Sequence, residues 1–380
     1  MGFNKGILLA LLALLLIALA GCATSSGGGP AEPGESYRIG FVAPLTGNTQ
    51  WYGEWQLKAI QLGVDEINAG GGIGGQELEI VAEDDQCLPK LGAEVMQRLA
   101  SVEKVPVVLG AYCSSVCMAM APIAEANKIV MVNVCNTDKL REAGDYIFRV
   151  KPGASQEGKF MAETIRRKGR AETLALLYIN NEYGASTKDV VKQQFEGLGG
   201  KIAAEEAFEQ GSSDFRAQLA KVKEARPDAV YLIGYAKENG LMMRQARELG
   251  LTQTFYSSLT LESPDFLAVA GEAAEGVVYP YLYNPQGRNP LTRAYNEKFR
   301  VRYGADSEMW GALYYDALRM LKPILEKCGK DSACIKDELY KVKDFEGVTG
   351  LTSFDEKGDI VKPYLLKEVR DGKFGAVRGT

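Results

Sequence analysis

The sequence predicts an α/β protein built from two doubly wound, Rossmann-like lobes. Short apolar runs that do not alternate with polar residues recur along the chain, and segments with helical periodicity separate them. Such runs are typical of parallel strands that are covered on both faces. This alternation occurs once before and once after Lys151-Pro152-Gly153, which favours two lobes. Each series also places a Tyr-Gly pair just before a helix, at Tyr52-Gly53 and Tyr183-Gly184.

The first series spans residues 38–134 and predicts one doubly wound layer. Its first helix is indicated by Leu57, Ile60, Val64 and Ile67, which recur at helical spacing. Asn68-Ala69-Gly70 ends that helix. Strands are expected at 38–42, 78–82, 105–110 and 129–134.

The second series, which begins after Lys151-Pro152-Gly153, and the C-terminal segment that follows it also predict strands and helices. Strands are expected at 173–179, near 202, and at 229–233, 255–256 and 277–283, and helices at 186–198, 215–225, 239–249 and 308–326. Asp306 or Ser307 is expected to cap the last helix. Residues 364–369 followed by Asp371-Gly372 predict a hairpin. Passages without helical periodicity near 150–154, 279–285 and 353–358 are candidate crossings between the lobes.

The first residues indicate export. Lys5 precedes an unbroken apolar run from Ile7 to Ala20, which is too short for a typical spanning helix and has secretory-signal architecture. Small residues then lead to Cys22, as in a lipoprotein signal that is cleaved after Gly21 and lipidated on Cys22. We therefore expect a signal peptide over 1–21 and a flexible tether over 22–36. An ordinary signal peptide or a membrane anchor is the alternative.

Composition excludes several function classes. The chain has 44 Lys and Arg against 49 Asp and Glu and lacks a basic block, which argues against nucleic acid and against a polybasic membrane patch. It has no histidine, so the commonest general base and the commonest metal ligand are both missing. We predict that the protein is not an enzyme and has no catalytic residues.

Six cysteines remain once Cys22 is assigned to lipid. An even number outside the cytoplasm predicts three disulfides. A zinc site would need four thiolates here, and free thiols are a further alternative. The six are Cys87, Cys113, Cys117, Cys135, Cys328 and Cys334.

A glycine pattern offers no cofactor site. Gly70, Gly72 and Gly75 satisfy GxGxxG, but they follow a helix and precede a strand, whereas a dinucleotide site needs the reverse order. We therefore expect no cofactor and no metal.

The stretch AYCSSVC, residues 111–117, follows the expected strand 105–110 and opens a helix. Open α/β sheets bind ligands at this edge. The helix start offers free backbone N–H groups, to which Ser114 and Ser115 add hydroxyls that can donate to a carboxylate. The alternative is that Ser114 only caps its own helix.

Further candidates lie at neighbouring strand ends. Thr137 can donate or accept a hydrogen bond, and the Cys135 carbonyl can accept from an ammonium group, although a simple turn would also explain both residues. Tyrosines at strand and loop ends can clamp an apolar ligand body. The candidates are Tyr52, Tyr183 and Tyr235.

Several segments together resemble the type I periplasmic binding proteins of ABC importers, and most closely the leucine/isoleucine/valine-binding branch. They include IGFVAPLTG, GVDEINAGGGIGGQELEIVAEDDQC, APIAEANKI, LMMRQARELGL and FDEKGD, in order across residues 37–370. The resemblance implies two α/β lobes, a three-strand hinge and a ligand enclosed in the cleft. It implies a first lobe of 37–151 plus 281–354 and a second lobe of 152–280 plus 355–380.

The resemblance also implies roles for individual residues. Ser114 corresponds to the serine that holds the ligand carboxylate, Thr137 to a threonine that contacts carboxylate and ammonium, and Cys135 to a backbone carbonyl that receives the ammonium. Tyr52, Tyr183 and Tyr235 correspond to cleft aromatics. Cys87–Cys113 corresponds to a family disulfide. Locality pairs Cys328 with Cys334, and this leaves Cys117 with Cys135.

One position departs from the family pattern. Branched-chain binders place a glutamate after the strand near Phe255 to pair with the ligand ammonium, and here Leu259 or Thr260 stands there. Either Glu262 or Glu182 substitutes, or the ligand is not an α-amino acid. An amide, a urea-like molecule or another carboxylate then becomes a candidate.

The resulting expectation is an extracytoplasmic lipoprotein that binds a small carboxylate-bearing ligand, foremost a branched-chain amino acid, by hinge closure. Its partners would be that ligand and an ABC permease. We expect a monomer that contacts the membrane only through its lipid, on the periplasmic side or the cell surface. A ligand sensor of the same fold is the alternative function.

Overall fold

The computed structural model describes residues 36–377. The predicted signal peptide, the predicted lipid-attachment residue Cys22 and all of the predicted tether except Ser36 lie outside the described residues. Within 36–377, no helix is long and apolar enough to cross a bilayer.

The first sheet has five parallel strands in the order β2-β1-β3-β4-β5. The four strands expected within 38–134 are confirmed. The fifth was missed because it has three residues, too few to show a pattern. The strands are β1 (Tyr37–Ala43), β2 (Leu78–Asp84), β3 (Val107–Gly110), β4 (Val130–Asn133) and β5 (Ile147–Arg149).

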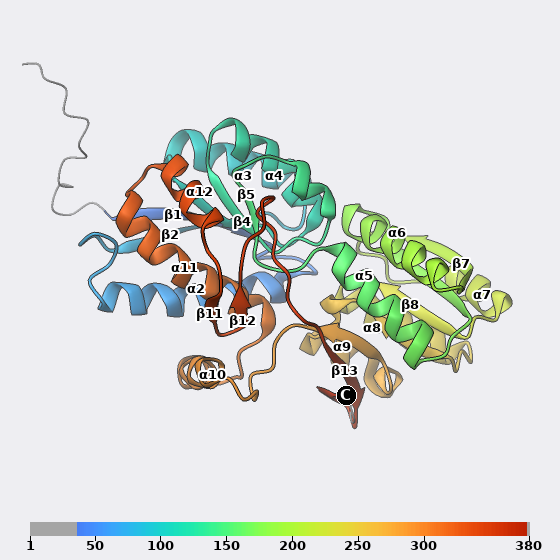
Figure 1. The fold of residues 1–380 in the computed structure, drawn as a ribbon. Helices are drawn as coiled ribbons and strands as arrows, with labels where there is room; N and C mark the ends of the chain where they lie inside the picture. Colours follow the sequence, from blue (N-terminus) through green and yellow to red (C-terminus); the bar gives the residue numbers. More distant parts are fainter. Residues whose placement is uncertain (1–35, 378–380) are drawn as a thin grey trace, which may run out of the picture. The chain divides into compact units, whose positions relative to one another are not determined.

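Helices from two distant parts of the chain cover this sheet (Figure 1). The early ones are α2 (Gln50–Ala69), α3 (Pro89–Arg98), α4 (Ser114–Ala126) and the short turns η1 (Leu99–Glu103) and η2 (Asp138–Glu142). The late ones are α10 (Pro290–Tyr303), α11 (Met309–Cys328) and α12 (Ser332–Tyr340). α11 packs along α2, and α3 packs on α4. We call this sheet and its helices the first lobe.

The second sheet has seven strands in the order β14-β13-β10-β9-β8-β6-β7. Five are parallel: β6 (Thr173–Ile179), β7 (Lys201–Phe208), β8 (Ala229–Ile233), β9 (Thr254–Ser257) and β10 (Val278–Tyr281). The predicted C-terminal hairpin is confirmed as the antiparallel pair β13 (Leu365–Arg370) and β14 (Lys373–Ala376).

The helices of the second sheet complete what we call the second lobe. They are α5 (Ala154–Glu163), η3 (Thr164–Lys168), α6 (Glu182–Gly197), α7 (Arg216–Ala225), α8 (Ala236–Glu248), η4 (Leu259–Leu261), α9 (Pro264–Ala270) and η5 (Gly271–Ala274). The chain passes between the lobes through residues 150–153, 282–289 and 353–364 (Figure 1). A small hairpin, β11 (Phe345–Gly347) with β12 (Gly350–Thr352), precedes the last passage.

One predicted cap is wrong. The side chain of Glu308, not Asp306 or Ser307, accepts hydrogen bonds from the first free amides of α11, those of Trp310 and Gly311, at 2.6 and 2.5 Å. The Ser307 hydroxyl is engaged by Asn296 instead.

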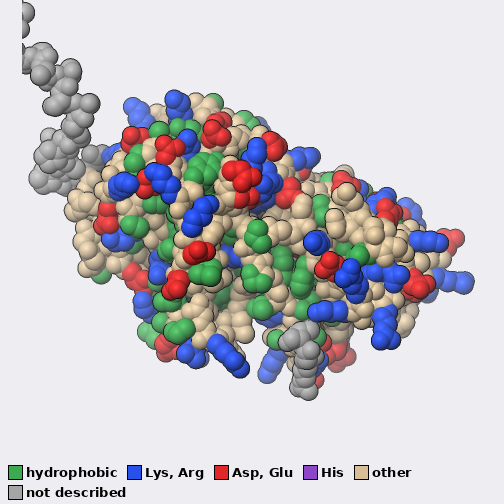
Figure 2. Space-filling view, viewed as in Figure 1, with side chains coloured by type: hydrophobic (Ala, Val, Ile, Leu, Met, Phe, Trp, Pro, Cys, Tyr) green, Lys and Arg blue, Asp and Glu red, His purple; other side chains and the backbone are tan. Residues whose placement is uncertain are grey.

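The strands that end at the lobe interface are buried along their whole length. Every residue of β3, β4 and β8 is buried, as their unbroken apolar runs predict. Each buried Val or Leu contributes about 1.5–3 kcal/mol to folding, which gives the strand ends a rigid base. On the visible surface, Lys and Arg are interspersed with Asp and Glu (Figure 2).

Candidate ligand-binding site

A small cavity of about 10 Å³, room for about one water molecule, lies between the two lobes. The first lobe supplies residues from the ends of β3 and β4 and from the starts of α4 and α11. The second supplies residues from the start of α6, the end of β8 and η4, and the first crossing adds Lys151. The lining residues are Tyr112, Ser114, Val134, Asn136, Lys151, Tyr183, Tyr235, Leu259, Thr260 and Trp310. The carboxyl ends of parallel strands therefore meet here from both sides.

Ser114 is the first residue of α4 and is buried. Its hydroxyl oxygen accepts the Asn136 backbone N–H at 3.0 Å, so its own hydrogen remains for a ligand oxygen. The alternative that Ser114 caps its helix is wrong, because Cys113 holds the cap position and no side chain caps α4. The first amides of α4 therefore have no side-chain acceptor.

Aromatic rings form a continuous wall across the interface. Tyr112 stacks on Tyr52 with centroids 4.5 Å apart and meets Trp310 edge-on at 4.8 Å. Tyr183 stacks on Tyr235 at 5.6 Å. Burial raises the pKa of the Tyr112 and Tyr183 hydroxyls well above 10, so both stay protonated. The wall suits an apolar or flat ligand body.

Tyr52 lies behind this wall rather than on the cavity surface. Its hydroxyl donates to the Thr260 carbonyl at 2.5 Å and accepts the Ala236 N–H at 3.1 Å. A first-lobe side chain is thereby fixed to two backbone groups of the second lobe.

Lys151 brings a positive charge to the cavity. The side chain is 1% exposed, and its Nζ donates to the Asn136 Oδ1 at 2.5 Å and to the Pro152 carbonyl at 2.6 Å. Burial lowers the pKa of Lys151 to about 7, while the negative charge of Glu157 opposes that decrease. Glu157 is itself fully buried, and its Oε1 accepts the Leu259 N–H at 3.1 Å.

The three remaining site candidates do not line the cavity. Ser115 Oγ accepts the Glu182 N–H at 3.2 Å, and Thr137 Oγ1 donates to Glu182 Oε1 at 2.7 Å. Thr137 also caps η2, which agrees with the simple turn considered for it. The Cys135 carbonyl accepts the Arg149 guanidinium at 3.3 Å.

These contacts hold the lobes together around the cavity. Glu182, at the start of α6, donates its N–H to Ser115, accepts from Thr137 and pairs with Lys139 at 2.8 Å. Nearby, Asn136 Nδ2 donates to Thr187 Oγ1 at 2.8 Å. Together with the bonds of Tyr52, they join the lobes on more than one side of the enclosed space.

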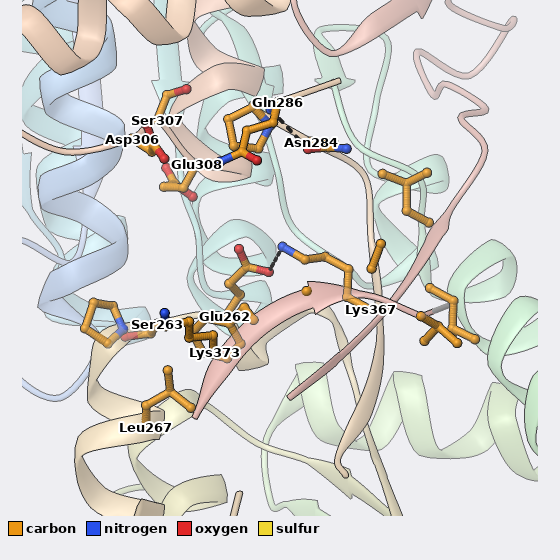
Figure 3. A pocket seen from close by; sticks show the side chains of 18 of the residues that line it. Glu262, Ser263, Leu267, Asn284, Gln286, Asp306, Ser307, Glu308, Lys367 and Lys373 are labelled. Atoms are coloured by element: carbon orange, nitrogen blue, oxygen red, sulfur yellow. Dashed lines mark hydrogen bonds and ion pairs between the residues drawn. The ribbon is translucent and has the colours of Figure 1, made fainter. Parts of the chain in front are cut away.

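Neither acid considered as an ammonium partner lines this cavity. Glu262 faces a separate groove, where it accepts the Tyr279 hydroxyl at 2.7 Å and pairs with Lys367 at 2.5 Å (Figure 3). Glu182 is used in the contacts between the lobes. Leu259 and Thr260, which stand at the family's glutamate position, do line the cavity. Among the described residues that line it, none is an aspartate or a glutamate.

Sequence reasoning missed several lining residues for identifiable reasons. Tyr112 and Asn136 adjoin candidates that were found, so proximity alone could have suggested them. Lys151 was noted only as part of a boundary between lobes. Trp310 comes from almost 200 residues further along the chain than Tyr112, and no local pattern indicates that they meet.

The part of the chain that the structure describes contains three disulfides. Cys87–Cys113 and Cys117–Cys135 fasten the two ends of the AYCSSVC stretch, with Cα atoms 5.5 and 6.5 Å apart. Cys328–Cys334 joins the end of α11 to α12. Within 36–377, no group of His, Cys, Asp or Glu is arranged to hold a metal ion.

The family model described as "Periplasmic binding protein" matches residues 36–373 of the chain. The chain belongs to this family: it is an extracytoplasmic solute-binding protein of the ABC-transporter type and not an enzyme. The resemblance and the fold predicted from the sequence are confirmed.

Individual relatives agree with this assignment. The leucine-, isoleucine-, valine-, threonine- and alanine-binding protein of Pseudomonas aeruginosa is 29% identical over 86% of this chain and 87% of its own length. A leucine-binding protein structure from Thermotoga maritima has a TM-score of 0.85 at 28% identity, covering 90% of this chain and 97% of that one. A branched-chain amino acid transporter substrate-binding protein from Streptococcus pneumoniae, solved with isoleucine, has a TM-score of 0.84 at 29% identity, covering 90% and 98%.

Proposed function

We propose that this protein is a lipid-anchored solute-binding protein that holds a small carboxylate-bearing solute in the cavity between its lobes and presents it to an ABC permease. The observation that carries the proposal is the cavity itself, which takes its walls from both lobes at the carboxyl ends of their strands. Ser114 and the first amides of α4 are the groups that would receive the carboxylate.

The mechanism follows from the contacts between the lobes. A solute that touches both lobes binds the closed arrangement more tightly than an open one, and it shifts the equilibrium by that difference in affinity. Bonds such as Tyr52 to Thr260 and Thr137 to Glu182 form only when the lobes are close. They would stabilise the closed surface that the permease meets. The residue division into lobes given above, and a monomeric state, are part of this proposal.

The names of the relatives make a branched-chain amino acid the first solute to test. The full chain should be unfolded in guanidinium, freed of any bound solute and refolded. Thermal-shift titration with amino acids, amides and small carboxylates is then expected to find at least one that raises the melting temperature. Small-angle scattering with that solute should show a smaller radius of gyration. A panel in which nothing binds and nothing compacts the protein would contradict the proposal.

The anchor rests on Cys22 and has its own test. Expressed in a bacterium, the protein should fractionate with membranes and carry a lipid on the peptide that begins at residue 22. Cys22→Ala should be found without lipid in the soluble fraction. Lipid-free native protein in the soluble fraction would contradict the anchor but not solute binding.

A further inference from the structure

The cavity has hydrogen-bond donors without acceptors. Lys151 uses two of its three N–H donors, on Asn136 and Pro152. The indole N–H of Trp310 and the hydroxyl of Tyr112 are buried, and neither has a hydrogen-bond partner among the described residues. The Ser114 hydroxyl has a hydrogen left to donate. Buried donors are normally satisfied, so this set indicates a bound group that accepts from several sides.

We propose that Lys151 receives the negative charge of the solute, and that the solute is a small organic anion with an apolar or aromatic body and no ammonium group. This inference rests on the proposed function and names the solute class for the same cavity. A carboxylate is acceptor-only and can take up to four hydrogen bonds, which matches the unused donors.

The groups that would hold an ammonium are absent from the cavity or already engaged. The described residues lining it include no carboxylate, and the Cys135 carbonyl accepts the buried guanidinium of Arg149. An ammonium in this space would meet the charge of Lys151, and the acid beside that lysine, Glu157, already offsets the lysine's own charge. Burying such a charge is unfavourable unless it is paired. An amino-acid solute therefore fits the walls less well than the same molecule without its amine.

The free acidic oxygen that acts on Lys151 belongs to Glu157. Its Oε2 is buried without a hydrogen-bond partner, but Glu157 does not line the cavity. Its strongest interaction with a charged group is with Lys151. Glu157 therefore balances the lysine when the cavity is empty, and a bound anion would take over that role.

The remaining walls fit a short, flat or branched body. Tyr112, Trp310 and Tyr235 present rings, and Val134 and Leu259 add aliphatic surface. In this arrangement the cavity measures about 10 Å³, so a solute with such a body needs the lobes to lie further apart than they do here.

Lys151 also makes binding depend on pH. The charged groups that act on it are Glu157 from α5, Arg149 from β5, Asp138 from η2 and Asp359 from the third crossing, with the tyrosine hydroxyls Tyr183 and Tyr235 across the cavity. Its pKa of about 7 should increase when an anion binds beside it. Affinity for an anion should therefore be highest below pH 7 and fall as the pH rises above that value.

Three probes of one shape test the inference: 4-methylpentanoate, its amide, and L-leucine, which is 4-methylpentanoate with an amine. Calorimetry on the stripped, refolded full chain at pH 6.5 should give 4-methylpentanoate at least about 10-fold higher affinity than either of the other two, as expected for one charge-assisted bond. Benzoate and benzamide repeat the comparison for a flat body.

Two substitutions move the affinity for 4-methylpentanoate in opposite directions. Lys151→Met keeps the length and removes the charge, so affinity should fall at least about 10-fold while the amide changes little. Glu157→Gln keeps Lys151 and removes the competing negative charge, so affinity should rise at a pH low enough to keep Lys151 protonated. The matched control is Lys362→Met, which removes another buried lysine, bonded to Thr349 and Thr352 and outside the cavity. Lys362→Met should leave the preference for 4-methylpentanoate over its amide and L-leucine unchanged.

The outcomes separate this inference from the proposed function. If leucine binds at least as tightly as 4-methylpentanoate and compacts the protein, the protein still binds solutes but the solute carries an ammonium, and the inference is wrong. Weaker leucine binding in Glu157→Gln would point to the same conclusion. If Lys151→Met does not refold, the wild-type preference and Glu157→Gln decide the question. If none of these probes and no member of the thermal-shift panel binds, both the proposed function and this inference are wrong.

Discussion

The hydroxyl of Ser114 can accept one hydrogen bond and donate another, which a single backbone N–H or C=O group cannot do. It accepts the Asn136 amide and so fixes the segment after β4, and it keeps a hydrogen directed to other acceptors. Ser115, one residue on, bonds instead to the second lobe through the Glu182 amide. Two adjacent and chemically identical side chains thus have different partners because successive residues of a helix face different directions.

Ser114→Ala should weaken solute binding at least about 10-fold, because it removes a buried donor and leaves the Asn136 amide without its acceptor. Ser115→Ala should have a smaller effect, since it removes only a contact between the lobes. Calorimetry with the solute found by the thermal-shift panel measures both. Equal affinities in wild type and Ser114→Ala would remove Ser114 from the site.

Single residues also show how far sequence reasoning extends at this site. Ser114, Tyr183 and Tyr235 were predicted and line the cavity, because each sits at a strand or helix end whose type could be deduced. Lys151 was not predicted as a site residue, because a lysine before a proline has no periodicity to place it. Its role depends on burial, which only the packed structure defines.

Helix α6 is the element that brings the second lobe to the site. The Asn181 side chain caps its start by accepting the Gly184 N–H at 3.1 Å. The first turns then direct Glu182, Tyr183 and Thr187 at the first lobe, and each makes a different kind of contact there. One short segment thus combines a capped start, contacts between the lobes and a cavity wall.

Glu182→Ala should favour an open arrangement, because it removes the bonds from Thr137 and Lys139 while the backbone bond to Ser115 remains. Each lost bond contributes about 1 kcal/mol, so losing both should lower the affinity for the solute by up to about 30-fold. Small-angle scattering should show a larger solute-free protein. Glu196→Ala, an exposed glutamate on the same helix, is the control and should change neither quantity. An unchanged affinity would mean that these bonds do not stabilise the closed arrangement relative to the open one.

The elements differ in how predictable they were. Long buried strands such as β6 and β8 were located to the residue because their apolar runs are unbroken. β5 has three residues, and only four residues, those of the first passage between the lobes, separate it from α5, so neither gave a usable pattern. The cap of α11 was misplaced because a glutamate is an unusual choice at that position, and only its two amide bonds identify it.

Buried acids couple the stability of the protein to pH. Burial raises the pKa of Glu308 to about 8, although the amides of Trp310 and Gly311 favour its charged form. The folded protein therefore keeps a proton that the unfolded chain releases near pH 4.5. Stability from this group is present at low pH and is lost as the pH rises from about 4.5 to 8. Asp85, whose pKa burial raises to about 7, acts in the same direction.

Glu308→Gln should flatten part of this dependence, because glutamine never ionises, and its single carbonyl oxygen can still accept from one of the two amides. Between pH 5 and 8, the free energy of unfolding should decrease more steeply with pH in wild type than in the variant. The two slopes should differ by up to about 1.4 kcal/mol per pH unit. Urea unfolding across that range measures the difference. Glu297→Gln, with a side chain that is 67% exposed, is the control and should follow wild type. Parallel curves for wild type and Glu308→Gln would show that Glu308 is ionised in the folded protein.

The three tryptophans of the chain all lie where the lobes meet. Trp310 lines the cavity, and Trp51 and Trp55 line the separate groove together with residues of α9 and β14. Tryptophan fluorescence, excited at the long-wavelength edge of the protein's absorbance, therefore comes only from residues at this interface. An unlabelled optical titration should follow solute capture directly, and replacing each indole in turn with phenylalanine would assign the signal to one side or the other.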